Sequence, residues 1–186
     1  MTNTNTSIIA LDNTRFIYAT NLAGDPRADR FGDARPKANI IIPDPDQAKE
    51  LIKAGIKVRE TRPRQDDDPD TFQPEYFVTA LLKYRTRDGA KVKYPPKVYL
   101  VSGDSAPVLL DEDSVKQIDT MRVQNVNVIL NPYEYEPGKV SLYIRTMYVE
   151  QRLDDDPYAK LYRFDISENG SPLCFRRRAD PVQQDL

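Results

Sequence analysis

The chain has 186 residues, of which 27 are Lys or Arg and 29 are Asp or Glu, so its formal net charge is −2, and it contains no histidine. This length is enough for one domain with a buried core that needs neither disulfides nor a metal. With no histidine and one cysteine, Cys174, the chain lacks the usual zinc ligands and the commonest general base. The composition therefore disfavours metal-dependent hydrolysis and Ser/His or Cys/His catalysis, and we expect a protein that is not an enzyme and has no cofactor or metal.

No apolar run is long enough to be a signal peptide or a membrane span, and Cys174 has no partner for an internal disulfide. We therefore expect a protein of a reducing cytoplasm with no membrane partner. The charges are segregated into acidic runs at 64–70 and 153–158 and basic runs at 84–97 and 174–178. A local patch can therefore carry a positive field although the chain as a whole is acidic. The acidic runs lack the glycine-anchored spacing of a calcium loop and are interpreted as solvated loops.

The first half of the chain is predicted to form short strands, one loop and one helix. We expect residues 1–13 to be a flexible N-terminus. Residues 22–36 carry Gly, Pro and Asp at the density of an irregular loop. The helix, 44–55, has Asp44 as N-cap, Pro45 at its first position and Gly55 as its stop. Runs of β-branched, aromatic or alternating residues predict strands at 14–21, 37–43 and 56–63.

The second half is predicted to contain longer strands and one more short helix. Asp111 is the expected cap of a helix over 111–119. Strands are expected at 75–86, 97–103, 122–135, 139–151 and 162–166. Several strands, one or two short helices and no strand–helix–strand alternation favour a mainly β barrel or sandwich. We treat 14–170 as a single domain and 171–186 as a C-terminal tail.

The segment NPYEYEPGKVSLYIRTMYVEQR, residues 131–152, belongs to two long strands joined by a turn. Each strand has one apolar face because its side chains alternate: Val126, Val128 and Leu130 in the first, and Val140, Leu142 and Ile144 in the second. The opposite faces are polar and aromatic, with Asn125, Asn127, Asn131, Tyr133 and Tyr135 in the first strand and Lys139, Ser141, Tyr143 and Arg145 in the second.

Two registers are open for this hairpin. A three-residue loop, 136–138, pairs Tyr135 with Lys139, Tyr133 with Ser141 and Asn131 with Tyr143, which brings the polar faces together. A two-residue Pro-Gly loop pairs Tyr135 with Val140 and mixes the faces, although Pro-Gly is the more familiar chemistry for a two-residue turn. The patterning favours the first register. The alternation changes phase after Thr146, which predicts a β-bulge there.

An outward face of Asn, Tyr, Lys and Arg on a sheet suits single-stranded nucleic acid. Aromatic rings stack on bases for about 1–3 kcal/mol each, while nearby cations follow the phosphates. Tyrosine suits this role because its body is apolar and its tip tolerates water. The alternative interpretation is that these tyrosines cover the end of the barrel or form an interface in an oligomer.

The order of segments resembles bacteriophage single-stranded DNA-binding proteins with an OB-fold. The resemblance is carried by AGDPRADRFGDARPKANIIIPD, AKELIKAGIKVRETRP, PPKVYLV and LDEDSVKQIDTMRVQNVNVILNPYEYEPGKVSLYIRTMYV, which cover most of residues 14–151. It implies an OB-fold-like five-stranded barrel with one or two short helices and long loops, whose final long hairpin contains VILNPYEYEPGK. Many relatives end in an acidic tail with a terminal aromatic that recruits replication proteins. This chain ends FRRRADPVQQDL, so we do not expect tail-mediated recruitment.

Three segments supply the predicted DNA-binding residues. The N-terminal loop provides Arg27, Arg30, Phe31, Arg35 and Lys37, although Asp25, Asp29 and Asp33 alternate with these cations and internal pairing is the competing interpretation. The basic turn provides Lys91, Lys93, Tyr94 and Lys97, for which a solvated hairpin tip is the alternative. The long hairpin provides Tyr133, Tyr135, Lys139, Tyr143 and Arg145.

The sequence therefore predicts sequence-independent binding of single-stranded DNA in phage DNA replication, recombination or repair, in the cytoplasm of the host cell. The other candidate partners are replication or recombination proteins and further copies of the chain. The competing hypothesis is a structural or oligomeric β-protein whose tyrosine-rich face is a protein interface, since Tyr and Arg are enriched there too.

Overall fold

The computed structural model describes residues 8–29, 32–63, 71–86, 88–103 and 105–152. They belong to a compact unit that ends at Arg152. The predicted strand at 162–166, the domain end at 170 and the C-terminal tail lie outside the described residues. Within the described part of the chain, no helix is long and apolar enough to cross a membrane.

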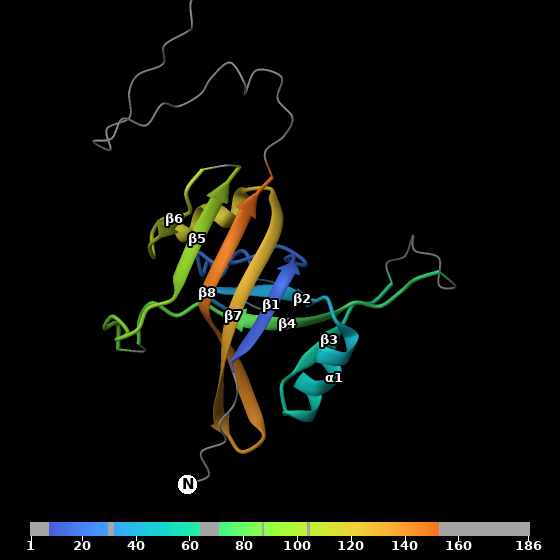
Figure 1. The fold of residues 1–186 in the computed structure, drawn as a ribbon. Coiled ribbons are helices and arrows are strands. Elements are labelled where there is room, and N and C mark those ends of the chain that lie inside the picture. The colour runs from blue at the N-terminus through green and yellow to red at the C-terminus, as the bar shows by residue number, and fades with distance from the viewer. Residues whose placement is uncertain (1–7, 30–31, 64–70, 87, 104, 153–186) are drawn as a thin grey trace, which may run out of the picture. The chain divides into compact units, whose positions relative to one another are not determined.

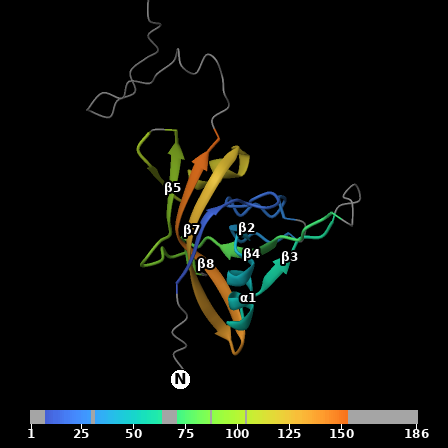
Figure 2. The same cartoon turned by 45° about the vertical axis from the view of Figure 1, so that its right-hand side comes forward.

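The described residues form one sheet. Its strands are β1 (Ile9–Thr14), β2 (Lys37–Ile42), β3 (Val58–Glu60), β4 (Tyr76–Leu81), β5 (Lys97–Ser102), β6 (Val108–Leu110), β7 (Val123–Glu136) and β8 (Lys139–Gln151). The main order is β1-β7-β8-β4-β2, with β3 added beside β4 and with β5 and β6 branching from β8. Figures 1 and 2 show β2 and β4 running across β7 and β8, so that the sheet curls over its core.

The prediction of a mainly β, OB-like fold with short helices is confirmed. The expected count of five strands is too low, because eight strands lie in the sheet, and the sheet is open rather than closed into a barrel. The short β6 is one of the strands that the sequence analysis missed: it has three residues and follows a proline-containing turn, so it gives little periodic signal.

Strand β8 changes its parallel partner half way along its length. Its residues 142–143 pair with β4, and its residues 146–151 pair with β5. Between the two, Ile129 of β7 pairs with Thr146 and Leu130 with Ile144, so Arg145 is an extra residue in β8. This β-bulge lies one residue before the predicted position. The chain between β4 and β5 therefore leaves and rejoins the sheet beside Tyr143 and Thr146.

The buried residues of the sheet form one hydrophobic core cluster. The alternation predicted for the long hairpin is confirmed, because the apolar faces of both strands are directed into this core. Its fully buried members include Val126, Leu130, Met147 and Val149. They are joined by Ile40 of β2, Val78 of β4 and Val98 of β5.

Helix α1 (Pro45–Lys53) confirms the predicted capping signals. The Asp44 carboxylate accepts a hydrogen bond from the Asp46 amide at 2.9 Å, and Pro45 opens the first turn. Gly55 has φ +79°, a left-handed conformation that L side chains avoid and that ends the helix. The helix buries Ala48 and Leu51 against the sheet, whereas Ile52 is 52% exposed.

Two elements near the N-terminus differ from the prediction. Strand β1 begins at Ile9, so residues 9–13 belong to the sheet rather than to a flexible end. The expected strand at 14–21 is not continuous. After Thr14 the chain follows the edge of β2 through two isolated bridges, Phe16 with Ile40 and Asn21 with Lys37.

The second helix, η1 (Val115–Thr120), is a 3₁₀ helix and starts later than predicted. Asp111 is not its N-cap. The Asp111 carboxylate instead accepts hydrogen bonds from the amides of Asp113 and Ser114 and from the Ser114 hydroxyl, which closes a separate turn before the helix. A short acidic run gives the same sequence signal in both cases, because both arrangements use a carboxylate to accept backbone amides.

Tyr84, just after β4, packs against the core with its hydroxyl buried. That hydroxyl has no hydrogen-bond partner among the described residues. Burial, followed by the negative charges of Asp111 and Glu112, raises the pKa of Tyr84 from 10.0 to about 12. The neutral phenol is therefore favoured in the folded protein.

We expect the free energy of unfolding to fall as the pH rises from 10.0 to about 12, because Tyr84 ionises in the unfolded chain before it ionises in the folded protein. Tyr84→Phe should remove this part of the pH dependence. At neutral pH it should leave stability unchanged or raise it by up to about 1 kcal/mol, since it deletes an unpaired buried hydroxyl. Urea unfolding at several pH values measures both effects, and a clear loss of stability at neutral pH would contradict the prediction.

Candidate functional site

One rung of the sheet brings the predicted segments together. Lys37 of β2 pairs with Leu81 of β4, Leu81 pairs with Tyr143 of β8, and Tyr143 pairs with Asn131 of β7. Paired residues on neighbouring strands project to the same face. We call this row the Tyr143 rung. It lies on the outer face, because the neighbouring positions along these strands are buried: Ala38, Ala80 and Leu142.

Tyr133 and Tyr143 form an aromatic pair on this outer face. Their ring centroids are 6.2 Å apart with an interplanar angle of 75°, an edge-to-face contact across β7 and β8. Tyr133 is 59% exposed. Lys83, two residues beyond Leu81, places its Nζ 5.9 Å from the centroid of the Tyr143 ring. The pair is thus open to solvent on one side and flanked by a cation on the other.

The hairpin combines features of both predicted registers. Glu136 pairs with Lys139, so the turn has two residues, Pro137 and Gly138, and the expected Tyr135–Lys139 pair is wrong. A bulge at Tyr135 then restores the favoured pairs, Tyr133 with Ser141 and Asn131 with Tyr143. The polar faces therefore coincide, as the patterning required.

The tip of the hairpin is less cationic than predicted. The Lys139 Nζ forms an ion pair with the Glu136 Oε2 at 2.5 Å, and both side chains are more than half exposed. The Glu134 Oε1 accepts a hydrogen bond from the Gly138 amide at 2.8 Å, which braces the turn. Tyr135 is 54% exposed beside these acids.

The N-terminal loop ends in a compact cluster of charges next to the Tyr143 rung. The Lys37 Nζ contacts the Asp29 carboxylate at 2.6 Å and the Asp33 carboxylate at 3.0 Å, and its side chain is only 19% exposed. Arg35 forms an ion pair with Asp33 at 2.9 Å but remains 70% exposed. Two acids and two bases therefore balance here, as the competing interpretation expected.

Electrostatics tie this cluster to the aromatic pair. Hydrogen bonds from Arg35 and then Lys37 hold the pKa of Asp33 well below its usual range. The Asp33 hydrogen bond is the main cause that raises the pKa of Arg35, and the Tyr143 phenol adds a smaller contribution in the same direction. Arg35 thus lies within electrostatic reach of Tyr143. Arg27 is exposed in the same loop, while Arg30 and Phe31 lie outside the described residues.

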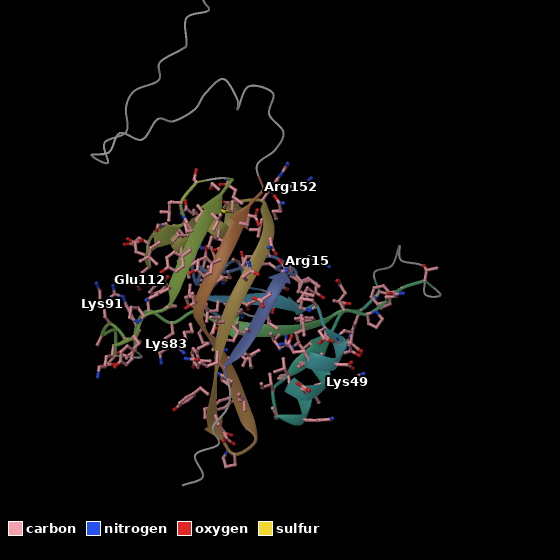
Figure 3. The ribbon with its side chains drawn as sticks, in the orientation of Figure 1. Arg15, Lys49, Lys83, Lys91, Glu112 and Arg152 are labelled. Carbon is pink, nitrogen blue, oxygen red and sulfur yellow. The ribbon has the colours of Figure 1, made fainter. Side chains whose placement is uncertain are left out.

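The loop between β4 and β5 carries several exposed cations that form no ion pair with a described acid. Its base is anchored by an ion pair between Arg85 and Glu112 at 2.7 Å. Figure 3 shows Lys83 and Lys91 on the side of β8 where this loop runs, with Lys49 on α1 away from them. Tyr94 is 82% exposed, and the Lys93 Nζ lies 5.3 Å from its ring centroid. Within the described ranges, no ion pair involves these exposed cations: Lys83, Lys91, Lys93, Lys97 and Arg145.

Lys83 and two further tyrosines, Tyr99 and Tyr148, belong to this outer face but were missed by the sequence analysis. Lys83 follows Leu81 at the period of two that places alternate residues on one face. Tyr99 and Tyr148 alternate with the buried Val98 and Met147, which is the signal that would have identified them.

The chemistry of the face is that of a binding surface. Flat aromatic rings, amide side chains and unpaired cations lie side by side on it, which suits a flexible polyanion with aromatic groups. Among the described residues, no group of three or more His, Cys, Asp or Glu side chains is arranged to hold a metal ion.

Asp33→Asn is expected to loosen the charge cluster, because the carboxylate holds both Arg35 and Lys37. The lowered pKa of Asp33 means that its stabilising effect is fully present above about pH 4 and is lost as the pH falls through the folded-state pKa. We expect a loss of about 1 kcal/mol or less at neutral pH that shrinks in acid. Urea unfolding at neutral and at acid pH checks this. Asp12→Asn is the matched control, because Asp12 is exposed and forms no ion pair among the described residues. An equal loss at both pH values would contradict it.

Comparisons with known proteins give one family and several structures. The model of a family described as "Putative phage ssDNA-binding domain" matches residues 2–169. No curated protein matches the chain.

Three solved structures of phage proteins are similar to the chain. The single-stranded DNA-binding protein of bacteriophage Enc34, as a C-terminal truncation, has a TM-score of 0.44 and 10% identity over 81% of this chain and 87% of its own. The same protein in complex with ssDNA has a TM-score of 0.44 and 13% identity over 83% of this chain and 90% of its own. The single-stranded DNA-binding protein gp2.5 of bacteriophage T7 has a TM-score of 0.39 and 14% identity over 85% of this chain and 98% of its own.

Proposed function

This chain belongs to the phage ssDNA-binding domain family, and we propose that it binds single-stranded DNA on the outer face around the Tyr143 rung, without sequence preference. The observation that carries the proposal is that rung, which gathers Lys37, Tyr143 and Asn131 from three strands with Tyr133 and Lys83 beside them. The activity belongs to phage DNA replication, recombination or repair in the host cytoplasm.

Bases stack on the tyrosines in this proposal. Every base has an aromatic face, so stacking provides affinity without reading the sequence. The Tyr133 ring is open to solvent, and the Tyr143 ring is held by Tyr133 at its edge and by Lys83. A ring held by its neighbours loses little conformational entropy when a base is added. Tyr135 extends the surface towards the turn.

Phosphates follow the unpaired cations. Lys83 lies over the Tyr143 ring, and the exposed Arg145 follows Tyr143 by two residues in β8. Lys91, Lys93 and Lys97 lie in or just after the β4–β5 loop. Lys37 acts mainly as a structural residue, since two carboxylates hold it and its side chain is largely buried. Arg27 and the exposed Arg35 of the N-terminal loop are further candidates for phosphate contacts. Arg30 and Phe31 lie outside the described residues and stay predictions from the sequence. Lys139 makes a smaller contribution because Glu136 already neutralises it.

The proposed role is binding rather than catalysis. DNA on this face needs a flat aromatic surface and a positive field, and the residues described above provide both. The competing hypothesis places another protein chain on the same tyrosines. It predicts self-association that depends on protein concentration and DNA binding that is weak even at low salt.

Tyr143→Ala and Tyr133→Ala should each weaken binding of oligothymidine by about 1–3 kcal/mol, because each removes a ring on which a base stacks. Tyr143→Phe keeps the ring and should bind almost as the parent does. Fluorescence anisotropy with a labelled oligonucleotide measures the affinity, and thermal unfolding shows whether each variant is folded. Full affinity in a folded Tyr143→Ala variant would remove the Tyr143 rung from the site.

Replacing both Lys91 and Lys93 by Ala should reduce the slope of log affinity against log salt by about 0.7 for each phosphate that the variant no longer neutralises. The matched control replaces Lys49 and Lys53 of α1, which changes the net charge equally but away from the proposed face. The control should shift affinity only slightly and leave the slope unchanged. Equal slopes in both double variants would mean that the β4–β5 loop lies outside the site.

A further inference from the structure

A second pair of tyrosines lies on the same outer face as Tyr143. Tyr99 of β5 pairs with Tyr148 of β8, and their rings are stacked with centroids 4.7 Å apart and an interplanar angle of 12°. Tyr148 is 40% exposed. Val98 and Met147, which alternate with them, are fully buried, so the pair faces outward. We call these two residues the Tyr99–Tyr148 pair.

The bulge at Arg145 is what aligns the two aromatic pairs. Tyr148 comes five positions after Tyr143, an odd number that in a regular strand would place the two side chains on opposite faces. The extra residue at Arg145 shifts the phase, so both tyrosines lie outward. At roughly 3.3 Å per residue, five positions span at most about 16 Å along β8, and the bulge shortens this distance slightly.

The surface between the two pairs is apolar and positive. The intervening row is Lys97 of β5, Thr146 of β8 and Ile129 of β7, with Ile129 36% exposed. Lys97 and Arg145 form no ion pair within the described part of the chain. The acidic Glu150 follows only beyond Tyr148, paired with Val101. A polyanion that crosses from one aromatic pair to the other therefore passes unpaired cations and no acid of these rows.

We infer that the Tyr99–Tyr148 pair is a second base-stacking platform for the same DNA strand. The inference rests on the proposed function of the Tyr143 rung and extends that site along β8. Two rings already stacked in parallel present a flat surface, and a base added to the exposed ring continues the stack. Leu109 of β6, 57% exposed and paired with Tyr99, extends this surface at its outer edge.

A protein partner is the other occupant that an exposed aromatic surface suits. The charges favour DNA, because the cations lie between the two platforms where a phosphate backbone would run. An isolated protein interface on the Tyr99–Tyr148 pair gives no reason for unpaired cations on the side of Tyr143. The two occupants make different predictions about oligonucleotide length.

The test is the affinity of Tyr148→Ala for oligothymidines of increasing length, over the range of about 4 to 16 nucleotides that OB folds cover. The shortest oligonucleotides reach only one platform. Those that bind at the Tyr143 rung do not contact Tyr148, so Tyr148→Ala should bind them with the affinity of the parent protein. Longer oligonucleotides reach both platforms, and for them the variant should bind about 5- to 150-fold more weakly. Tyr143→Ala should weaken binding at every length.

Three further variants separate stacking from folding. Tyr148→Phe keeps the ring and should retain the affinity for long oligonucleotides, whereas Tyr148→Leu keeps apolar bulk without a flat ring and should lose it. Ile52→Ala, at an exposed apolar residue of α1, should bind as the parent does. Photocrosslinking of an oligonucleotide that carries 5-iodouracil, read by mass spectrometry, should label the peptide that contains Tyr148 in the unsubstituted protein.

The outcomes are distinct. If Tyr143→Ala weakens binding and folded Tyr148→Ala binds every length as the parent does, the second platform is wrong and the proposed function remains. If neither variant weakens binding, the proposed function fails as well. If Tyr148→Ala leaves DNA affinity unchanged but abolishes self-association in analytical ultracentrifugation, the pair is a protein interface and the inference is overturned.

Discussion

The structure depends on the way β8 pairs with two different strands along one edge. Its first half pairs with β4 and its second half with β5, and the extra residue Arg145 lies where the partner changes. Without the bulge, the side chains after Arg145 would exchange faces, and Met147 and Val149 would leave the core. The same residue therefore keeps the core continuous and keeps the aromatic residues of β8 on one outer face.

This pairing also places the basic loop. Strand β4 ends beside Tyr143 and β5 begins beside Thr146. Both ends of the β4–β5 loop therefore lie next to the same short stretch of β8. Lys83 then comes to lie over the Tyr143 ring, and Lys97 lies next to the intervening row. Cations far apart in sequence from the tyrosines reach them through strand order and not through sequence proximity.

Ion pairing decides which cations remain available to a ligand. The sequence predicts Lys37 and Lys139 as DNA-binding residues on the same grounds as Lys91 and Lys93. In the folded chain, however, Lys37 and Lys139 form ion pairs with acidic side chains. The buried position of Lys37 between Asp29 and Asp33 gives it a structural role at the end of the loop. The exposed Arg35 keeps part of its guanidinium accessible although Asp33 holds it. A count of basic residues would overstate the positive field of the N-terminal loop and of the hairpin tip.

Much of the architecture follows from local chemistry. The N-cap Asp44, the stop at Gly55 and the alternation of Val126, Val128 and Leu130 each act over a few residues, so the sequence predicts helix α1 and the faces of the long hairpin. The register of the long hairpin was less predictable from the sequence, because the Pro-Gly turn and the side-chain pattern favoured different pairings. A bulge at Tyr135 satisfied both, and its occurrence depends on the sheet around it.

The sequence by itself therefore determined helix α1, most of the strands, the inward and outward faces of the long hairpin and its tyrosine-bearing surface, since these depend on local propensity and the two-residue period of a strand. Only the tertiary structure decided that β4 and β5 share β8, that Lys83 meets Tyr143, that Tyr99 stacks on Tyr148 and that Lys37 is held by acids. These contacts join residues that are distant in the chain, and pairing between distant strands or charges leaves no periodic signal in the sequence.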